Sequence, residues 1–358
     1  MKHWLFLTSA LFNSIYALPI ECSLNDPKGF IQYDLKEHLK FKHIIKRVSC
    51  AAYKANAPME DRYAMAVNER DAFFTVMDGH GGWQVAEYVK EHLIVNTQEE
   101  LDNMMKKCQD EKVCQVDGLS SAITRGFEKT DSDLLNKVRE NFNMGYKQVA
   151  SVGSCALLVH LNSKRITIAN AGDCRVVLGK SLNGERVTST PLSLDHNARE
   201  DREQKRLAAE HPGEEDIVQC QSKTACYVKG RLQPTRSMGD FYLKYSEFHT
   251  QRGGLFTPPY ITATPEIIQH ERDEKVDRFL IIGSDGVWDF LENQEAVDIV
   301  QREVDNKTPE FASQAIVEAV LAKAASESNM SLKELVTLDA GNQRRNRHDD
   351  TTAVVIYL

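Results

Sequence analysis

Acidic residues stand beside apolar runs in four segments that are far apart in this sequence. The segments are APMEDRYAMAV (57–67), FFTVMDGHGG (73–82), RFLIIGSDGVWD (278–289) and RHDDTTAVVIYL (347–358). In two of them the acidic residue follows an apolar run that is typical of a strand, and in the other two it precedes one. Antiparallel neighbours would bring all four acidic ends to the same edge.

A shared edge would gather several carboxylates in a small space. Such a cluster repels itself strongly unless its charge is neutralised, and a pair of divalent cations would do this. Ligands that are all oxygen suit Mg²⁺ or Mn²⁺ better than zinc. An aspartate beside a glycine usually marks only a turn, but four such segments together favour a metal site. The residues expected to gather are Glu60, Asp61, Asp78, Asp285, Asp289, Asp349 and Asp350.

The elements that must position these carboxylates follow from the apolar periodicity. Strands are expected over 63–67 and 72–77, and a helix over 85–101, where apolar residues recur at spacings of three and four. The runs SCALLVHL, RITIANAG and CRVVLGK are closely spaced and indicate three strands in antiparallel hairpins. The remaining predictions are helices over 119–142, 200–210, 294–304 and 309–325, an irregular insert over 213–265, and strands over 278–285 and 350–358.

These strands cluster among helices without a regular β-α alternation. This favours layered α+β architecture over a doubly wound sheet. The chain has 358 residues and no linker that clearly divides it, so one catalytic domain is expected. We assign residues 48–358 to this domain, residues 18–47 to an N-terminal extension and residues 1–17 to a signal peptide.

The first residues, MKHWLFLTSALFNSIYALPIECS, resemble a secretory signal peptide. Lys2 and His3 precede a short apolar run, and small residues with a proline follow, so cleavage is expected after Ala17. The run is shorter than the roughly 20 apolar residues of a membrane span, so no stable membrane insertion is expected. A secreted or secretory-pathway protein is therefore predicted. The alternatives are a cytoplasmic location and an apolar N-terminal segment that packs on the domain.

The sequence contains eight cysteines, and an even number in a secreted chain permits disulfides. Cys155 and Cys174 lie within apolar strand patterns and are expected to be core thiols. Two other pairs lie close together in polar, loop-like stretches, where local bridges are predicted. These bridges are Cys108–Cys114 and Cys220–Cys226.

The formal net charge is −8, with 42% hydrophobic and 27% charged residues. An acidic chain is a poor match for the phosphates of nucleic acid, so no nucleic-acid partner is expected. The same charge and the lack of basic clusters argue against a metal-dependent nuclease, which would use a similar two-metal site. A monomer is expected.

Eight motifs, in order along residues 48–358, resemble those of the metal-dependent protein phosphatase family, protein phosphatase 2C. They are MED (59–61), DGHGG (78–82), GSCALL (153–158), NAGDCR (170–175), LDHNA (194–198), TRSMGDF (235–241), SDGVWD (284–289) and RHDDTT (347–352). The resemblance implies a four-layer α-β-β-α sandwich, in which helices flank two antiparallel β-sheets. It also implies hydrolysis of phosphoserine and phosphothreonine in a phosphoprotein substrate, with two Mg²⁺ or Mn²⁺ ions per site.

The resemblance further implies the roles of individual residues. Asp78 would bridge two cations together with a water, and the resulting hydroxide would attack the phosphorus without a phosphoenzyme. His80, beyond a tight turn of Gly79, Gly81 and Gly82, would protonate the leaving alkoxide. Metal binding falls to Glu60, Asp61, Asp78, the carbonyl of Gly79, Asp285 and Asp349, and a third, weaker ion would use Asp173 and Asp289. For Asp173 the alternative is a simple hairpin turn.

Phosphate binding is where the sequence departs from the family. Many members carry an arginine four residues before the glutamate of MED, and this chain has Asn56 there. An amide can donate hydrogen bonds to phosphate but adds no charge. The predicted phosphate site is therefore Asn56 with Lys54 or Arg62, although either cation could equally be a solvated surface charge. The asparagine, with LSLDHNAREDREQKRLAAEHP and TPPYITATPE, resembles the pyruvate dehydrogenase phosphatase branch.

A catalytically weak pseudophosphatase scaffold is the alternative function. Bound metal carries out the chemistry of such enzymes, so a pseudophosphatase would be marked by the loss of metal-binding carboxylates. The sequence retains every carboxylate that the motifs require.

Overall fold

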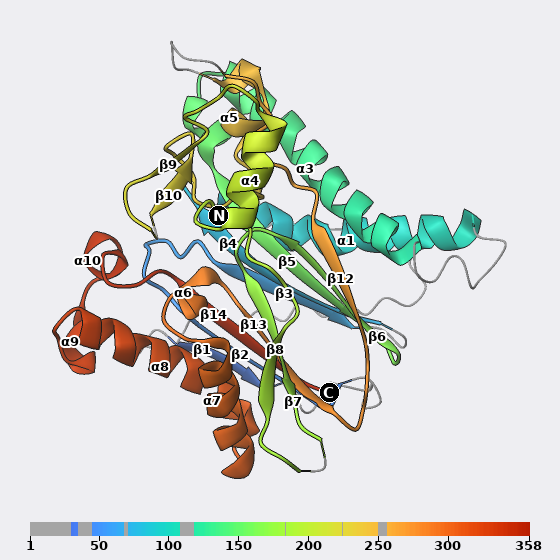
Figure 1. Ribbon diagram of the computed structural model, residues 1–358, viewed down its shortest axis with the longest axis vertical. Helices are drawn as coiled ribbons and strands as arrows, with labels where there is room; N and C mark the ends of the chain where they lie inside the picture. The colour runs from blue at the N-terminus through green and yellow to red at the C-terminus, as the bar shows by residue number, and fades with distance from the viewer. Residues whose placement is uncertain are drawn as a thin grey trace, which may run out of the picture.

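Two antiparallel β-sheets pack face to face in the computed structural model, and helices cover both outer faces (Figure 1). The structure describes residues 30–34, 45–67, 71–107, 118–182, 184–223, 225–249 and 256–358. Its layers follow the order helix, sheet, sheet, helix. The predicted four-layer α+β sandwich is therefore confirmed.

The first sheet has the strand order β1-β2-β14-β13-β7-β8. Its strands are β1 (Phe30–Asp34), β2 (Arg47–Tyr53), β7 (Arg175–Lys180), β8 (Thr188–Pro191), β13 (Asp277–Gly283) and β14 (Thr351–Tyr357). β1 lies within the predicted N-terminal extension, and its pairing with β2 adds an edge strand to the domain.

The second sheet has the order β12-β6-β5-β4-β3, and the short β11 also pairs with β5. Its strands are β3 (Arg62–Val67), β4 (Ala72–His80), β5 (Gly153–Leu161), β6 (Arg165–Ala171), β11 (Met238–Gly239) and β12 (Glu266–Glu271). The strands predicted at 63–67 and 72–77 are confirmed, and β4 extends three residues further than expected.

The core between the sheets is built from alternate residues of the strands. Phe74 and Val76 of β4 belong to the same buried cluster as Leu280 of β13 in the opposite sheet. Phe73 and Met77 of β4 instead belong to the cluster beneath the helices. Successive side chains of a strand point to opposite faces, so β4 is buried on both faces. Its apolar run is therefore continuous rather than alternating.

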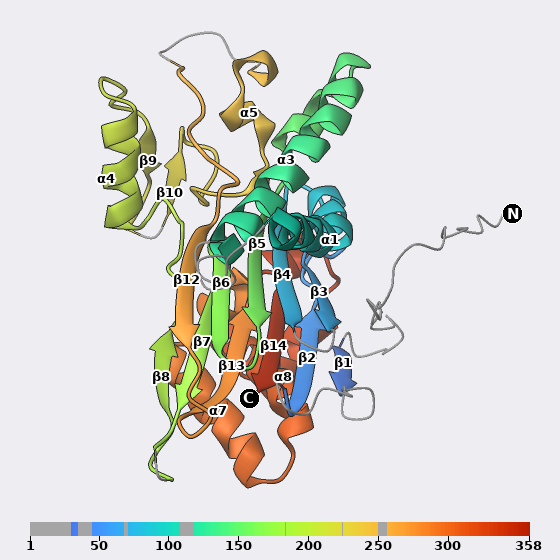
Figure 2. The ribbon, with the colours of Figure 1, turned by 90° about the vertical axis from the view of Figure 1, so that its right-hand side faces the viewer.

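Long helices cover each outer face of the sandwich (Figure 2). α1 (Gln84–Lys107) and α3 (Leu119–Asn143) pack on the second sheet. α7 (Asn293–Asp305) and α8 (Ala312–Glu327) pack on the first. Each buries an apolar stripe, as amphipathic helices do, and these four of the five predicted helices are confirmed; the fifth, predicted over 200–210, is confirmed as well. The short helical elements are η2 (Lys147–Ser151), α6 (Asp285–Trp288), η4 (Pro309–Phe311), α9 (Leu332–Thr337) and α10 (Asn342–Arg345).

The predicted insert gathers at one end of the sandwich (Figure 1). Together with the preceding helix, α4 (Asp201–Glu210), it forms a small core that includes Leu207 of that helix, Ile217 and Tyr260. A disulfide joins Cys220 to Cys226 across the β9-β10 hairpin, so this predicted bridge is confirmed. The elements here are α4 (Asp201–Glu210), β9 (Val218–Cys220), β10 (Cys226–Val228), α5 (Phe241–Lys244) and η3 (Ser246–Phe248).

The other cysteine predictions have different outcomes. Cys155 and Cys174 are free and buried, which confirms that they are core thiols. Cys108 and Cys114 lie outside the described residues, so their bridge stays a prediction. The same holds for the signal peptide over residues 1–17. Within the described ranges, no helix combines the length and apolar character that crossing a bilayer requires.

One predicted hairpin is wrong. β5 and β6 do pair as a hairpin, but β7 leaves this sheet and pairs with β13 and β8 in the other one. The Gly172-Asp173 segment is therefore a crossover between sheets and not a hairpin turn. Gly172 has a φ of +138°, a conformation that residues with a side chain rarely adopt. It lets the chain leave one sheet at the end of β6.

Candidate active site

The four acidic segments meet at one end of the sandwich, as predicted. β3 and β4 are antiparallel, so Asp61 before β3 lies beside the end of β4 that carries Asp78. β13 and β14 are antiparallel in the other sheet, which brings Asp285 beside Asp349. The four ends are thus paired two by two in separate sheets, and the packing of the sheets unites them.

Three carboxylates form the centre of this cluster. Oxygens of Asp78, Asp173 and Asp285 all lie within 4.8 Å of one another. Burial, and then the charge of Asp285, raises the pKa of Asp78 well above its usual value. Burial, and then the charge of Asp349, does the same to the pKa of Asp285. Protons or bound cations must relieve this repulsion.

The cluster fits a divalent cation on two observations. Its donors are all carboxylate oxygens, which Mg²⁺ and Mn²⁺ prefer. Oδ1 of Asp285 is buried and has no hydrogen-bond partner among the described residues. A buried acceptor without a partner is costly, and a bound ion would satisfy it.

Asp61 is buried behind the cluster and joins the two sheets. Its Oδ2 accepts hydrogen bonds of 2.7 Å from the hydroxyl of Ser284 and of 2.7 Å from that of Thr352. Burial, and then the charge of Asp350, raises its pKa well above the usual value, and the two hydroxyls oppose this rise. Its charge in turn raises the pKa of Asp78.

The adjacent Asp349 and Asp350 have different environments. Burial raises the pKa of Asp349 to about 6, although the charge of Arg345 opposes the rise, and Nη2 of Arg345 lies 2.5 Å from its Oδ2. Asp350 is buried and accepts hydrogen bonds from the backbone N–H groups of Ala55, Asn56 and Glu60. The predicted gathering includes Asp350, but its carboxylate anchors the segment that presents Glu60.

The strand β4 continues through Asp78 and Gly79 to His80, so the tight turn predicted at Gly79 is wrong. His80 is the last residue of β4 and pairs with Gly153, the first residue of β5, so the ladder ends there. The positive φ angles begin only at Gly81 (+69°) and Gly82 (+138°). Gly79 lacks a side chain for another reason, because a Cβ there would lie 2.5 Å from the carbonyl oxygen of Glu60.

His80 contacts an aspartate that received no role in the sequence analysis. Its Nε2 lies 2.6 Å from Oδ2 of Asp240, which is fully buried. Burial lowers the pKa of His80, but the charge of Asp240 and this hydrogen bond outweigh burial, so the pKa is raised. Asp240 belongs to the TRSMGDF motif inside the insert, and no periodicity in the sequence indicates where its side chain points.

Asp173 is held from two sides. The thiol of Cys155 donates to its Oδ1 at 3.0 Å, and Nδ2 of Asn197 donates to its Oδ2 at 2.8 Å. Asp289, the other predicted ligand of a third ion, is exposed at the rim. Nη1 of Arg199 lies 3.5 Å from its Oδ1.

The residues of the predicted phosphate site differ in how many contacts they already make with other side chains and with the backbone. Nδ2 of Asn56 already donates to Asp349 (3.3 Å) and Asp350 (3.1 Å). The guanidinium of Arg62 contacts the carboxylate of Glu87 and donates to the carbonyls of Met59 and Asp61. Lys54 is exposed. Arg199 and Arg345, which the sequence analysis did not single out, are the guanidinium groups that touch predicted metal-binding carboxylates.

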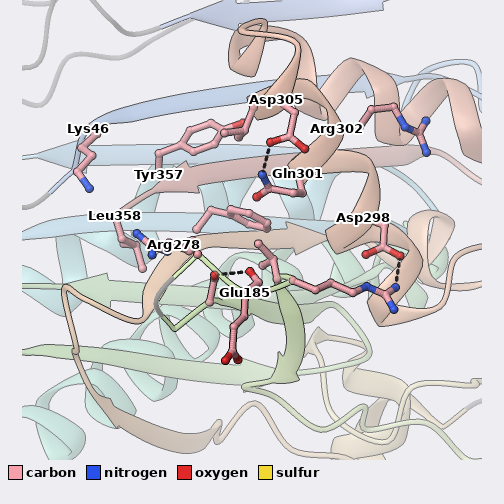
Figure 3. A pocket seen from close by; sticks show the side chains of 15 residues that line it. Lys46, Glu185, Arg278, Asp298, Gln301, Arg302, Asp305, Tyr357 and Leu358 are labelled. Carbon is pink, nitrogen blue, oxygen red and sulfur yellow. Dashed lines mark hydrogen bonds and ion pairs between the residues drawn. The ribbon is translucent and has the colours of Figure 1, made fainter.

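A cavity of about 750 Å³ lies at the other end of the sandwich (Figure 3). Its lining includes Phe279 near the start of β13 and Tyr357 at the end of β14. The acidic residues adjoin the opposite ends of these two strands. The cavity therefore forms no part of the acidic site.

The protein phosphatase 2C family model matches residues 46–329. The chain belongs to the protein phosphatase 2C family. "Probable protein phosphatase 2C 64" of Arabidopsis thaliana is 33% identical over 336 residues, which cover 88% of this chain and 78% of the relative. "Probable protein phosphatase 2C 78" of Oryza sativa subsp. japonica is 34% identical over 333 residues, with 90% and 79% covered.

The serine-threonine phosphatase 2C of Toxoplasma gondii, a solved structure, shares the fold with a TM-score of 0.66 and 18% identity, covering 92% of this chain and 98% of that one. As a member of the protein phosphatase 2C family, the chain is a metal-dependent protein serine/threonine phosphatase that acts on phosphoproteins. The narrower resemblance to the pyruvate dehydrogenase phosphatase branch stays a prediction.

Proposed function

We propose that this phosphatase hydrolyses phosphoserine and phosphothreonine with water as the direct nucleophile, at a site for two Mg²⁺ or Mn²⁺ ions. The close approach of Asp78, Asp173 and Asp285 carries this proposal, because their mutual repulsion is relieved by cations. When bound, the cations would activate the water and neutralise the phosphoryl group. No residue of the chain needs to form a covalent bond to phosphorus.

The chain's own residues have separate tasks in this proposal. Asp78, Asp285, Asp349 and the carbonyl of Gly79 would hold the cations, with Glu60 and Asp61 acting directly or through water. His80 donates a proton to the leaving seryl or threonyl oxygen. Asp173 and Asp289 serve a third, weaker ion, and the position of Asp173 beside Asp78 and Asp285 supports a site that adjoins the first two.

Hydrolysis of a phosphothreonine peptide tests the proposal, with and without Mn²⁺, by the wild type and by Asp285→Asn. We expect the variant to lose most activity, and Mn²⁺ binding measured by calorimetry to weaken in parallel. Asp305→Asn is the matched control, because Asp305 lines the remote cavity. Full activity of Asp285→Asn, or of the wild type in excess chelator, would contradict the proposal. A wild type that binds Mn²⁺ but hydrolyses nothing would support the pseudophosphatase alternative.

We also propose that the protein enters the secretory pathway. The composition of residues 1–17 supports this, as does the Cys220–Cys226 bridge, because disulfides persist mainly in oxidising compartments. N-terminal sequencing of protein from its native host tests the cleavage after Ala17. An intact Met1 would favour the cytoplasmic alternative.

A further inference from the structure

Three neighbouring strands place His80, Gly153 and Gly239 in one row. His80 of β4 is paired with Gly153 of β5, and Gly153 is paired with Gly239 of β11. Asp240 follows directly, and its N–H donates to the carbonyl of Val152 at 3.0 Å. A residue far along the chain, within the insert, is thereby brought beside the DGHGG motif.

The backbone of Asp240 has an unusual conformation. Its φ and ψ are +48° and +39°, in the left-handed region that residues with a side chain seldom occupy. Such conformations persist where the surroundings over-determine them, and they are often found at functional sites. Here the side chain reaches Nε2 of His80 at 2.6 Å, and the hydroxyl of Ser237 donates to the same oxygen at 2.7 Å.

This contact exists because residue 153 is glycine. A Cβ at Gly153 would overlap both Oδ2 of Asp240 and Nε2 of His80. The pair therefore occupies the space that a side chain on β5 would fill. The close approach of His80 and Asp240 therefore follows from the packing of three strands, unlike a chance contact between two surface side chains.

A buried ion pair between Asp131 and Lys244 stabilises the turn that carries Asp240. Oδ1 of Asp131, on α3, accepts from the N–H of Gly239 at 2.8 Å, and its Oδ2 lies 2.7 Å from Nζ of Lys244. Lys244 also donates to the carbonyl of Ser237 at 2.9 Å. These contacts hold residues 237–240 on both sides of the turn, so Asp240 has little freedom to move away from His80.

We propose that Asp240 is a positioning residue, which holds Nε2 of His80 so that Nδ1 faces the leaving-group oxygen. This inference rests on the proposed function, in which His80 donates the proton. The bond from phosphorus to the leaving oxygen breaks, its electron pair stays on that oxygen, and the proton of Nδ1 moves to it. Water forms the new P–O bond; one of its protons stays on the phosphate product, and the other returns through solvent to His80.

The test compares two substrates that differ in their need for an acid. The leaving group of a phosphothreonine peptide is the threonyl alkoxide, which must be protonated. The leaving group of p-nitrophenyl phosphate is a phenolate, which is stable without a proton. General acids contribute about 10²–10⁴-fold, so we expect Asp240→Asn to lower kcat on the peptide by about tenfold or more. On p-nitrophenyl phosphate kcat should change by less than about threefold. A fold-only role would lower both rates equally, and that result would overturn the inference.

His80→Ala separates this inference from the proposed function. If His80→Ala shows the same substrate-selective loss and Asp240→Asn does not, the acid role stands and the positioning role fails. If His80→Ala shows no selectivity, the acid role itself fails. In the His80→Ala background, Asp240→Asn should add no further loss, since it acts through His80. An additional loss there would contradict the inference.

Two further variants keep the result decisive. Ser237→Ala removes a neutral donor to the same oxygen and should give a smaller selective loss, so it decides the question if Asp240→Asn does not fold. A Ser237→Ala variant with equal losses on both substrates would overturn the inference. Asp201→Asn, an exposed aspartate of α4, is the matched control and should change neither rate. Thermal melting and Mn²⁺ binding report whether fold and metal site are intact.

Discussion

The carboxylate of Asp61, directly before β3 of one sheet, accepts a 2.7 Å hydrogen bond from the hydroxyl of Ser284, directly after β13 of the other. The same hydroxyl accepts from the N–H of Thr352 at 3.0 Å. This small buried network ties the two sheets together beneath the acidic cluster. It couples the stability of the sandwich to the geometry of the metal site.

Ser284→Ala should therefore destabilise the fold. It leaves Asp61 with one donor fewer and the N–H of Thr352 without its partner, and an unsatisfied buried group costs about 1–3 kcal/mol. Urea denaturation measures the free energy of unfolding. The control is Ser151→Ala, whose exposed hydroxyl donates to the carbonyl of Gln148, and it should change that free energy by less than about 0.5 kcal/mol. Equal effects of the two changes would contradict the prediction.

The stability of the metal-free protein should fall as the pH rises from about 4 towards 7. Burial raises the pKa of Asp349 to about 6, above its ordinary value of 3.8. Between these values the native state binds more protons than the unfolded state, so the free energy of unfolding decreases as the pH rises. Asp61, Asp78 and Asp285 shift in the same direction.

Melting temperatures at pH 5, 6 and 7 in chelator measure this effect. Added Mn²⁺ should oppose it, because a cation that binds the ionised carboxylates stabilises the native state more at higher pH. Asp349→Asn should flatten the slope in chelator. A melting temperature that rises from pH 5 to pH 7 without metal would contradict the predicted loss of stability with rising pH.

Gly153→Ala should separate His80 from Asp240. The new Cβ overlaps both side chains, so the loss of kcat should be larger on a phosphothreonine peptide than on p-nitrophenyl phosphate. Gly145→Ala controls for destabilisation by a glycine replacement, since its Cβ would meet nothing within 4 Å and its φ is +105°. The control should show no preference between the substrates. Equal losses on both substrates for Gly153→Ala would argue against the prediction.

Arg345→Ala should strengthen Mn²⁺ binding. The guanidinium lies 2.5 Å from Asp349 and competes with a cation for that carboxylate. The guanidinium of this pair is exposed to solvent, and such a pair contributes up to about 1 kcal/mol, so the Kd should fall by up to about fivefold in calorimetric titration. Arg347→Ala is the matched control, an exposed arginine two residues away for which the described residues provide no ion pair. Weaker binding by Arg345→Ala would show that the guanidinium supports the site instead.

The acidic site and most of its frame could be predicted from the sequence because their signals are local. The apolar spacing of α1 and α3 is set by helical periodicity, and the continuous apolar runs of β4 and β13 mark strands buried on both faces. Asp61, Asp78, Asp285 and Asp349 adjoin such runs, so antiparallel pairing accounts for the meeting of Asp61 with Asp78 and of Asp285 with Asp349.

Tertiary structure decided how those ends meet and which residues support them. Asp173 reaches the cluster because β7 changes sheets, a choice made by the packing of two buried faces and not by the Gly-Asp pair itself. Asp240 reaches His80 across 160 residues because β11 pairs with β5 beside a bare glycine. Asp349 and Asp350 are adjacent and alike in sequence and share the amide of Asn56, but Asp350 accepts from the backbone N–H of Ala55, whereas Asp349 contacts Arg345. Sequence periodicity predicts individual helices and strands, because it depends on residues that are close together in the chain. These contacts instead join elements that are far apart in the chain, so only their packing in three dimensions determines them.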